Sequence, residues 1–349
     1  MEATGAIRGE VRRSGYRRVS HGLYLPVTGG NGPGIETLRD LAAWRLVLPD
    51  DAVFTHITAA HLRGWWLPRL PRFVPVFAAT HLQSNRPRRA GLICSRLDRE
   101  SAGEVAAGLP VDAASEVLLR AARDLSTLDL VPMIDSALRA GHVQTAELDA
   151  ICSSGRPGVR RLRYSAALAD PRSESAWESI LRLFHHVAEI DVVPQVNVHD
   201  DSGRWVARVD LAVTGTPYVH EYDGRIHEHE ERRTSDLRRA RRLSDAGKIR
   251  RGYVADDLIN HPRTAMQEMD RELGRRFLPS RLGAVVSLGR RVVVLRCRPP
   301  ATAEPLAAAH RHHRLVGNRM IRWLDVAVGD QTAGSGGLRE SGTALGADA

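Results

Sequence analysis

The stretch WVARVDLAVTGTPYVHEYDG (205–224) decides the fold of the C-terminal half of this chain. Its segment TGTP (214–217) is small and polar, which is typical of a turn. On either side of that segment lie runs rich in Val, Tyr and Trp, as expected for β-strands. The stretch therefore predicts a hairpin with strands at 205–213 and 218–224.

The position of the turn determines which residues face one another across the hairpin. With residues 214–217 in the turn, Asp210 lies opposite Glu221, and Arg208 lies opposite Asp223. Because side chains alternate between the two faces of a strand, all four project from the same face. A register shifted by one residue would separate them.

Asp210 and Glu221 are predicted to lie close enough to repel each other. Directly opposed cross-strand residues have Cβ atoms about 4.5–5.5 Å apart. Two carboxylates at that distance need a shared proton or a cation between them. Mg²⁺ or Mn²⁺ prefers such oxygen ligands, and water on the metal can attack a phosphodiester. We therefore expect a divalent metal site; the alternative is a charged hairpin face exposed to solvent.

The segments around the hairpin alternate between helical and strand patterns, which predicts a mixed α/β fold. A central mixed sheet flanked by helices is the expected architecture. Gly247 is suitably placed to end a long charged helix. We expect helices at 176–189, 229–246 and 263–276, and strands at 193–198 and 249–254.

The same region resembles the PD-(D/E)XK nuclease superfamily, and within it the branch similar to very-short-patch-repair endonucleases. The likeness covers roughly residues 172–260. It rests on a helix that opens with Ser-x-x-Glu, a strand with Val-Asp-Leu, and a strand with Glu-Tyr-Asp-Gly followed by a histidine. In this chain these are Ser175 and Glu178, Val209-Asp210-Leu211, Glu221-Tyr222-Asp223-Gly224, and His227.

The resemblance implies a restriction-endonuclease-like domain that binds Mg²⁺ or Mn²⁺ and acts on DNA. It implies that Asp210 and Glu221 hold the metal ion and that Glu178 is a third ligand. Asp223 stands where many members of the superfamily have a lysine. His227 is the natural general base in its place, because neutral imidazole accepts protons near pH 7.

Three of these candidate catalytic residues have simpler explanations. Ser175 and Glu178 also form the pattern of a capping box at a helix N-terminus. Asp223 would pair with Arg208 across the hairpin, and His227 would be an ordinary loop histidine.

Arginine is abundant in the predicted helix 229–246 and could neutralise the phosphates of a duplex. The acidic residues between the arginines favour a different interpretation, a solvated helix with internal ion pairs. The candidate nucleic-acid-binding residues are Arg208 on the hairpin and Arg232, Arg238, Arg239 and Arg242 on the helix.

The N-terminal half resembles AbiEi-type antitoxins through VLPDDAVFTHITAAHLRGWWLP (47–68). VSHGLYLP (19–26) is similar to the wing of the winged helix that begins such proteins, although most of the recognition helix is missing. The resemblance implies DNA and a toxin as partners. We expect a partial winged-helix region at 1–70, an α+β region at 71–168, the nuclease-like domain at 172–277, an extension at 278–329 and a disordered tail at 330–349.

Composition is consistent with a cytoplasmic protein that binds an anionic partner. The 349 residues carry a formal net charge of +9, which also fits a basic protein without such a partner. The three cysteines are far apart, so neither a disulfide framework nor a zinc site is expected. We see no signal peptide and no apolar run long enough to span a membrane.

Two functions are consistent with these patterns. The first is a Mg²⁺-dependent DNA endonuclease in defence or DNA repair. The second is a non-enzymatic, antitoxin-like DNA-binding regulator that retains an inactive nuclease fold. The sequence leaves RNA open as a substrate in place of DNA.

Overall fold

The computed structural model describes residues 7–8, 15–26, 38–71, 74–224 and 230–289, with the side chains of 7–8 and 230–235 excluded. Within these residues the fold is mixed α/β, as predicted, with sheets of three, five and four strands. No helix in the described ranges is both long and apolar enough to cross a membrane.

The N-terminal half contains the three-stranded sheet, in the order β1-β3-β2, and the five-stranded sheet, in the order β6-β5-β4-β8-β7. The first sheet is antiparallel and the second is mixed. The strands are β1 (Ile7–Arg8), β2 (Tyr16–Ser20), β3 (Leu23–Pro26), β4 (Val53–Phe54), β5 (Val76–His81), β6 (Leu92–Leu97), β7 (Glu104–Ala106) and β8 (Leu109–Val111).

Helices of the N-terminal half pack around one hydrophobic core that runs from Leu23 to Leu162. Strand β4 pairs with both β5 and β8, so residues on either side of residue 70 share a sheet and a core. The helices are α1 (Leu38–Trp44), the 3₁₀ turn η1 (Arg45–Val47), α2 (His56–Leu62), α3 (Ala114–Ala121), α4 (Thr127–Arg139), α5 (Thr145–Cys152) and α6 (Val159–Ala167).

The C-terminal half is built on a four-stranded sheet in the order β12-β11-β10-β9. Strand β12 is parallel to β11, and the other neighbours are antiparallel. Its elements are α7 (Ala176–Val187), β9 (Val192–His199), β10 (Trp205–Val213), β11 (Tyr218–Tyr222), α8 (Glu230–Asp245), β12 (Ile249–Tyr253), α9 (Ala255–Ile259), α10 (Pro262–Glu272) and α11 (Ser280–Leu288).

The elements predicted for this half are confirmed, with ends that differ by a few residues. Helix α8 ends before Gly247, whose φ of +68° suits the predicted helix-stopping glycine. Helix α11 lies in the predicted extension, and its Val285 and Leu288 join the same core as α7.

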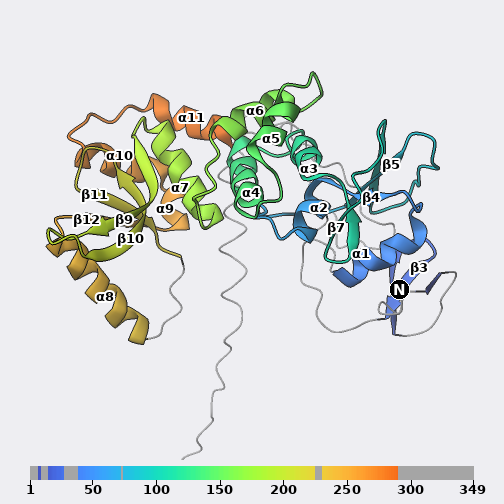
Figure 1. Cartoon of the computed structure of the whole chain (residues 1–349), viewed down its shortest axis with the longest axis horizontal. Helices are drawn as coiled ribbons and strands as arrows, with labels where there is room; N and C mark the ends of the chain where they lie inside the picture. The colour runs from blue at the N-terminus through green and yellow to red at the C-terminus, as the bar shows by residue number, and fades with distance from the viewer. Residues whose placement is uncertain (1–6, 9–14, 27–37, 72–73, 225–229, 290–349) are drawn as a thin grey trace, which may run out of the picture.

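Helices cover this sheet from two sides. In Figure 1, α7, α10 and α11 lie above the sheet and α8 lies below it. Leu243 of α8 is fully buried against Val198, Val206 and Val219. On the α7 side, Leu181 and Phe184 pack with Leu211 and Met266 in a separate core. The sheet therefore has an apolar layer on each side.

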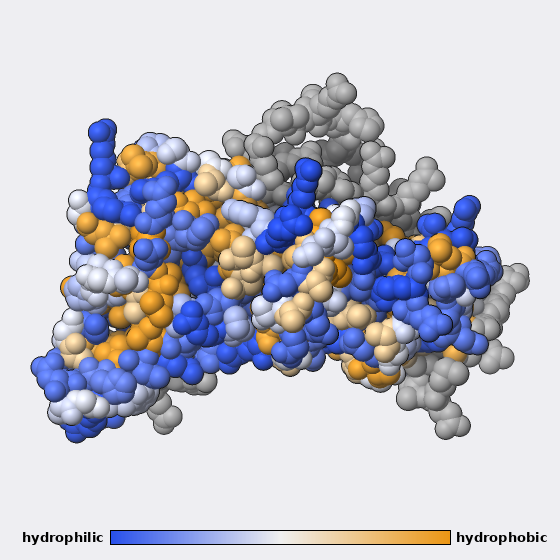
Figure 2. Space-filling model, turned by 45° about the horizontal axis from the view of Figure 1, so that its top comes forward, coloured by the Kyte–Doolittle hydropathy of each residue, from blue (hydrophilic) through white to orange (hydrophobic). Residues whose placement is uncertain are grey.

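The two halves meet where α4 packs against α7, in the middle of Figure 1. Asp135 of α4 is fully buried and accepts hydrogen bonds from Ser179 Oγ (2.6 Å) and Arg182 Nη2 (2.7 Å) of α7. Most of the face shown in Figure 2 is hydrophilic, with hydrophobic patches between the charged residues. The cores described above, rather than this surface, hold most of the apolar side chains.

Candidate functional site: a carboxylate cluster on the C-terminal sheet

The β10–β11 hairpin has the register that the turn position predicts. Leu211 pairs with His220, and Ala212 pairs with Val219. Continuing that register by one residue places Asp210 opposite Glu221. The turn at 214–217 and the alternating pattern of the strands were therefore sufficient to align the two carboxylates.

Asp210 carries a partly buried carboxyl group. Its Oδ2 atom accepts a hydrogen bond from the backbone N–H of Tyr222 (2.9 Å), and no ion pair involves it among the described residues. Burial is the main cause that raises the pKa of Asp210 to about 6, and the charges of Glu178 and Glu221 raise it further. Asp210 therefore lies near enough to both Glu178 and Glu221 to interact with them electrostatically.

Glu221 is almost completely buried, with 4% of its surface exposed, and it is held by two arginines. Arg239 of α8 forms a two-pronged ion pair with it, with Nη1 2.7 Å from Oε2, and Arg250 of β12 donates to the same oxygen. Although burial raises the pKa of Glu221, these two guanidinium groups lower it below the ordinary value. Two guanidinium groups therefore contact Glu221 where a divalent metal ion was predicted.

Glu178 lies at the first turn of α7 but does not complete the capping box. Ser175 Oγ accepts the backbone N–H of Glu178 (3.2 Å), which is one half of that motif. The Glu178 carboxylate bonds elsewhere, since its Oε2 accepts from the backbone N–H of Glu174 (2.7 Å) and from Gln195 Nε2 (2.8 Å). Its orientation is therefore set by the sheet as well as by the helix.

Asp223 pairs with Arg250, and the alternative pairing of Asp223 with Arg208 is wrong. Arg208 reaches Glu174 instead. The Asp223 carboxylate lies over Gly252 of β12, where an added Cβ would stand 1.8 Å from Asp223 Oδ2. Burial raises the pKa of Asp223 even though Arg250 opposes that change. Glycine at 252 therefore leaves the space that this carboxylate occupies.

The arginines predicted to bind nucleic acid differ in their surroundings. Arg239 is part of the carboxylate cluster, while Arg238 and Arg242 are exposed on α8. Arg208 is exposed and ion-paired with Glu174. His227 and the side chain of Arg232 lie outside the described residues.

Two residues of the cluster were not identified from the sequence. Arg250 lies on β12, where its guanidinium forms ion pairs with Glu221 and Asp223. Gln195 belongs to none of the sequence motifs described above. Its position opposite Asp210 follows only from the pairing of β9 with β10. The charged residues of the predicted strand 249–254 were the available signal for Arg250.

The donor set of this cluster suits a hard divalent cation only in part. Glu178 and Asp210 supply carboxylate oxygens that are not bound by arginine, whereas both oxygens of Glu221 contact Arg239. No three His, Cys, Asp or Glu side chains in the described ranges are gathered closely enough to hold a metal ion. A site with all three ligands requires Glu221 to exchange Arg239 for the cation.

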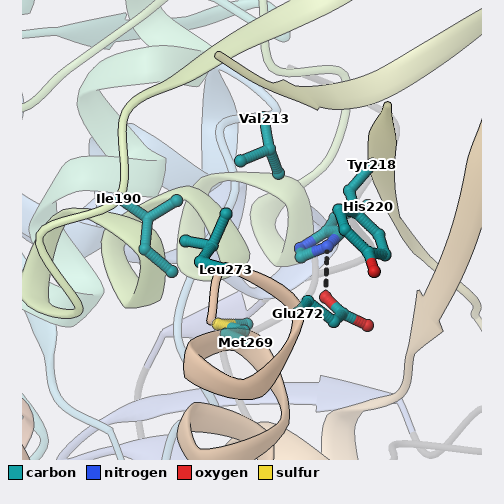
Figure 3. A pocket seen from close by; sticks show the side chains of 7 residues that line it. All are labelled: Ile190, Val213, Tyr218, His220, Met269, Glu272 and Leu273. Carbon is teal, nitrogen blue, oxygen red and sulfur yellow. Dashed lines mark hydrogen bonds and ion pairs between the residues drawn. The ribbon is translucent and has the colours of Figure 1, made fainter. Parts of the chain in front are cut away.

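A second polar cluster lies on the α7 side of the same sheet. His185 Nδ1 is 2.8 Å from the Leu181 carbonyl, His185 Nε2 is 2.7 Å from His220 Nδ1, and His220 Nε2 is 3.0 Å from Glu272 Oε2. Figure 3 shows the hydrogen bond between His220 and Glu272 beside the apolar side chains of Ile190, Val213, Met269 and Leu273. The polar groups of this cluster therefore satisfy one another within an apolar layer.

Comparisons of the chain with protein-family models, with curated proteins and with solved structures give no match.

Proposed function

We propose that the C-terminal half of this chain is a Mg²⁺- or Mn²⁺-dependent DNA endonuclease. One observation carries the proposal: Asp210 is a partly buried carboxyl group with no ion pair among the described residues, and the charges of Glu178 and Glu221 raise its pKa further. A partly buried carboxylate among like charges destabilises a fold, and such groups concentrate at functional sites. The resemblance to PD-(D/E)XK nucleases names the same three residues.

In this proposal Asp210 and Glu178 offer the first oxygen ligands, and Glu221 joins them when Arg239 releases it. A bound divalent ion would supply an activated water and stabilise negative charge on a phosphodiester. Arg239 and Arg250 keep Glu221 ionised and in place until then. A guanidinium that leaves a carboxylate can pair with a phosphate oxygen in the same geometry.

The proposed general base is His227. Asp223 is a poor candidate for that role, because its carboxylate is ion-paired with Arg250. Asp223 instead orients Arg250, whose guanidinium also contacts Glu221.

The test is plasmid nicking by the purified full chain with Mg²⁺ or Mn²⁺. We expect wild type to nick the plasmid and Asp210→Asn, which keeps the shape of the side chain, to lose nearly all activity. Chelation should abolish the wild-type reaction. Absence of nicking by wild type, or equal nicking by both proteins, would contradict the proposal.

A second candidate is a DNA-binding protein without nuclease activity, and it is favoured by the ion pairs that hold Glu221. If Arg239 and Arg250 neutralise Glu221 permanently, the carboxylate pair is structural and exposed arginines such as Arg238 and Arg242 bind phosphates. This candidate predicts DNA binding that needs no divalent cation and weakens with salt. Arg238→Gln and Arg242→Gln should each lower the slope of log affinity against log salt by about 1.

A further inference from the structure

Strand β12 is an edge strand of the four-stranded sheet, and its outer side has no partner strand among the described residues. In Figure 1 it lies at the left side of the molecule. Ile249 at its start is 41% exposed, and Arg251 and Gly252 are exposed as well. An edge strand of this kind presents backbone groups that can pair with another chain.

The hydrogen bonds between β12 and β11 show which groups of β12 point outward. The N–H of Ile249 donates to the Pro217 carbonyl (3.0 Å), so this residue bonds to the β11 side. Because alternate residues of a parallel strand bond to the same neighbour, every second residue after Ile249 does so too. The N–H and C=O groups of Arg250 and Gly252 therefore point away from the sheet. No turn, loop or side-chain hydrogen bond reaches these four groups within the described ranges.

The opposite edge of the sheet, β9, is protected against such pairing. The N–H of Thr214 donates to the Asp191 carbonyl (2.9 Å). The alternation of an antiparallel ladder then directs the backbone of Pro194 outward. Proline has no N–H to offer at that position, and natural edge strands avoid association in this way. Strand β12, with the sequence IRRGY, has no proline and so lacks this protection.

The charges beside β12 favour an acidic partner. Lys248 directly precedes the strand, and Arg241 and Arg242 are exposed near the end of α8. None of these three forms an ion pair within the part of the chain that the structure describes. Asp245 contributes one negative charge among them. The surroundings of the edge are therefore basic, and a segment that carries carboxylates complements them.

Two other occupants fit this edge less well. Antiparallel pairing of two copies over all five residues of β12 would place the two Arg251 side chains face to face, and like charges directly opposite destabilise a sheet. A nucleic acid would offer phosphate oxygens, which only accept hydrogen bonds. The outward carbonyls of Arg250 and Gly252 need donors, which the backbone of a polypeptide supplies.

We propose that the outer edge of β12 binds an extended acidic segment of another protein by strand addition. The backbone of that segment pairs with Arg250 and Gly252, and its carboxylates lie near Lys248 and the end of α8. Main-chain hydrogen bonds supply the affinity in this mode of recognition, and side chains supply the selectivity. The inference goes beyond the proposed nuclease function and does not depend on it.

The probe is a fluorescently labelled peptide in which Glu and Val alternate, titrated with the full chain and followed by anisotropy. We expect saturable binding, which should be lost when Lys replaces Glu in the peptide. It should also be lost when the backbone nitrogens of the peptide are methylated, because methylation removes the N–H donors. Lys248→Gln should weaken binding by up to about 5-fold, the size of an exposed ion pair. The control Arg160→Gln, at an exposed position of α6, should bind like wild type.

Amide hydrogen exchange of the full chain locates the contact. In the free chain the N–H groups of Arg250 and Gly252 should exchange faster than that of Arg251, which is bonded to β11. The acidic peptide should slow exchange at Arg250 and Gly252 and change Arg251 little.

Absence of saturable binding by the acidic peptide would overturn the proposal. Equal binding of the methylated peptide would overturn it too, because the contact would then be electrostatic without strand pairing. Slow exchange at Arg250 and Gly252 in the free chain would show that the edge is already covered, by a second copy if light scattering finds a dimer. Protection of these two amides by a labelled DNA duplex in place of the peptide would assign the edge to nucleic acid.

Discussion

Asp210 and Glu221 occupy facing positions on β10 and β11, but among the residues that the structure describes only Glu221 is ion-paired with arginine. The difference arises because Arg239 reaches both oxygens of Glu221 from α8, whereas Asp210 accepts a single backbone hydrogen bond. One carboxylate is thereby stabilised in its charged form and the other is destabilised.

Asp210→Asn should make the protein more stable at pH 7.5. The pKa of Asp210 is about 6 in the folded chain against an ordinary value of 3.8, so its stabilising contribution is present below pH 3.8 and lost as pH rises through 6. Asparagine cannot ionise, and one pKa unit corresponds to about 1.4 kcal/mol, so the gain at pH 7.5 is on the order of 2 kcal/mol. Chemical denaturation at pH 7.5 and 4.5 measures it, and the gain should shrink at the lower pH.

Asp135→Asn is the matched control for that variant. Burial also raises the pKa of Asp135 to about 6, but this carboxylate is paired with the largely buried guanidinium of Arg182. Removing its charge leaves Arg182 unpaired between α4 and α7, which should cost about 3 kcal/mol. A loss of stability in Asp210→Asn at pH 7.5 would contradict the claim that the charge of Asp210 is uncompensated.

Arg239→Gln should bind Mn²⁺ more tightly than wild type. The guanidinium of Arg239 occupies both oxygens of Glu221, so it competes with a cation for that ligand. The metal-free variant should be less stable by about 2 kcal/mol, because buried Glu221 loses one of two partners. Calorimetry with Mn²⁺ and denaturation without it provide the two measurements.

The exposed neighbour Arg238 supplies the control for this competition. Arg238→Gln removes the same charge from the same helix and should change neither quantity. Equal Mn²⁺ affinity in wild type and Arg239→Gln would show that Glu221 is not a ligand, which favours the structural ion pair.

Gly252→Ala should destabilise the protein by about 1–3 kcal/mol, in the range of overpacked sites. The new methyl group would stand 1.8 Å from Asp223 Oδ2, so the carboxylate must move and lose its ion pair with Arg250. Gly283→Ala, within α11 and with open space around it, should instead be neutral or stabilising by up to about 1 kcal/mol. Thermal unfolding compares the two.

The double variant Asp223→Ala with Gly252→Ala tests the cause of that loss. Removing the obstructing carboxylate should make the second substitution nearly neutral. If Gly252→Ala lowers the stability of the Asp223→Ala protein as much as it lowers that of wild type, the Asp223 carboxylate is not the cause of the loss.

Acid should destabilise the C-terminal half through His185. Burial lowers the pKa of His185 from 6.5 to about 3, so its stabilising contribution is present above pH 6.5 and lost as pH falls toward 3. Between pH 7 and 5 the loss should be about 1–2 kcal/mol. His185→Gln keeps an oxygen that can accept from His220 but cannot be protonated, so its stability should change less over this range. The measurement is the denaturation midpoint of wild type and of His185→Gln at pH 7 and 5. An equal change in both proteins would contradict the claim that protonation of His185 causes the loss.

The sequence by itself determined the hairpin, its register and most elements of the C-terminal half. This was possible because a turn of known length and the two-residue period of strands are local properties. Aligning Asp210 with Glu221 requires only the position of residues 214–217. The long helix and its glycine stop follow from equally local patterns.

Only the tertiary structure decided which groups surround those carboxylates. Arg239 and Arg250 reach Glu221 because α8 packs across the sheet through Leu243 and β12 lies parallel to β11. Gln195 reaches Glu178 because β9 pairs with β10. The physical reason is that side-chain partners from separate elements depend on how those elements pack, which no local periodicity encodes.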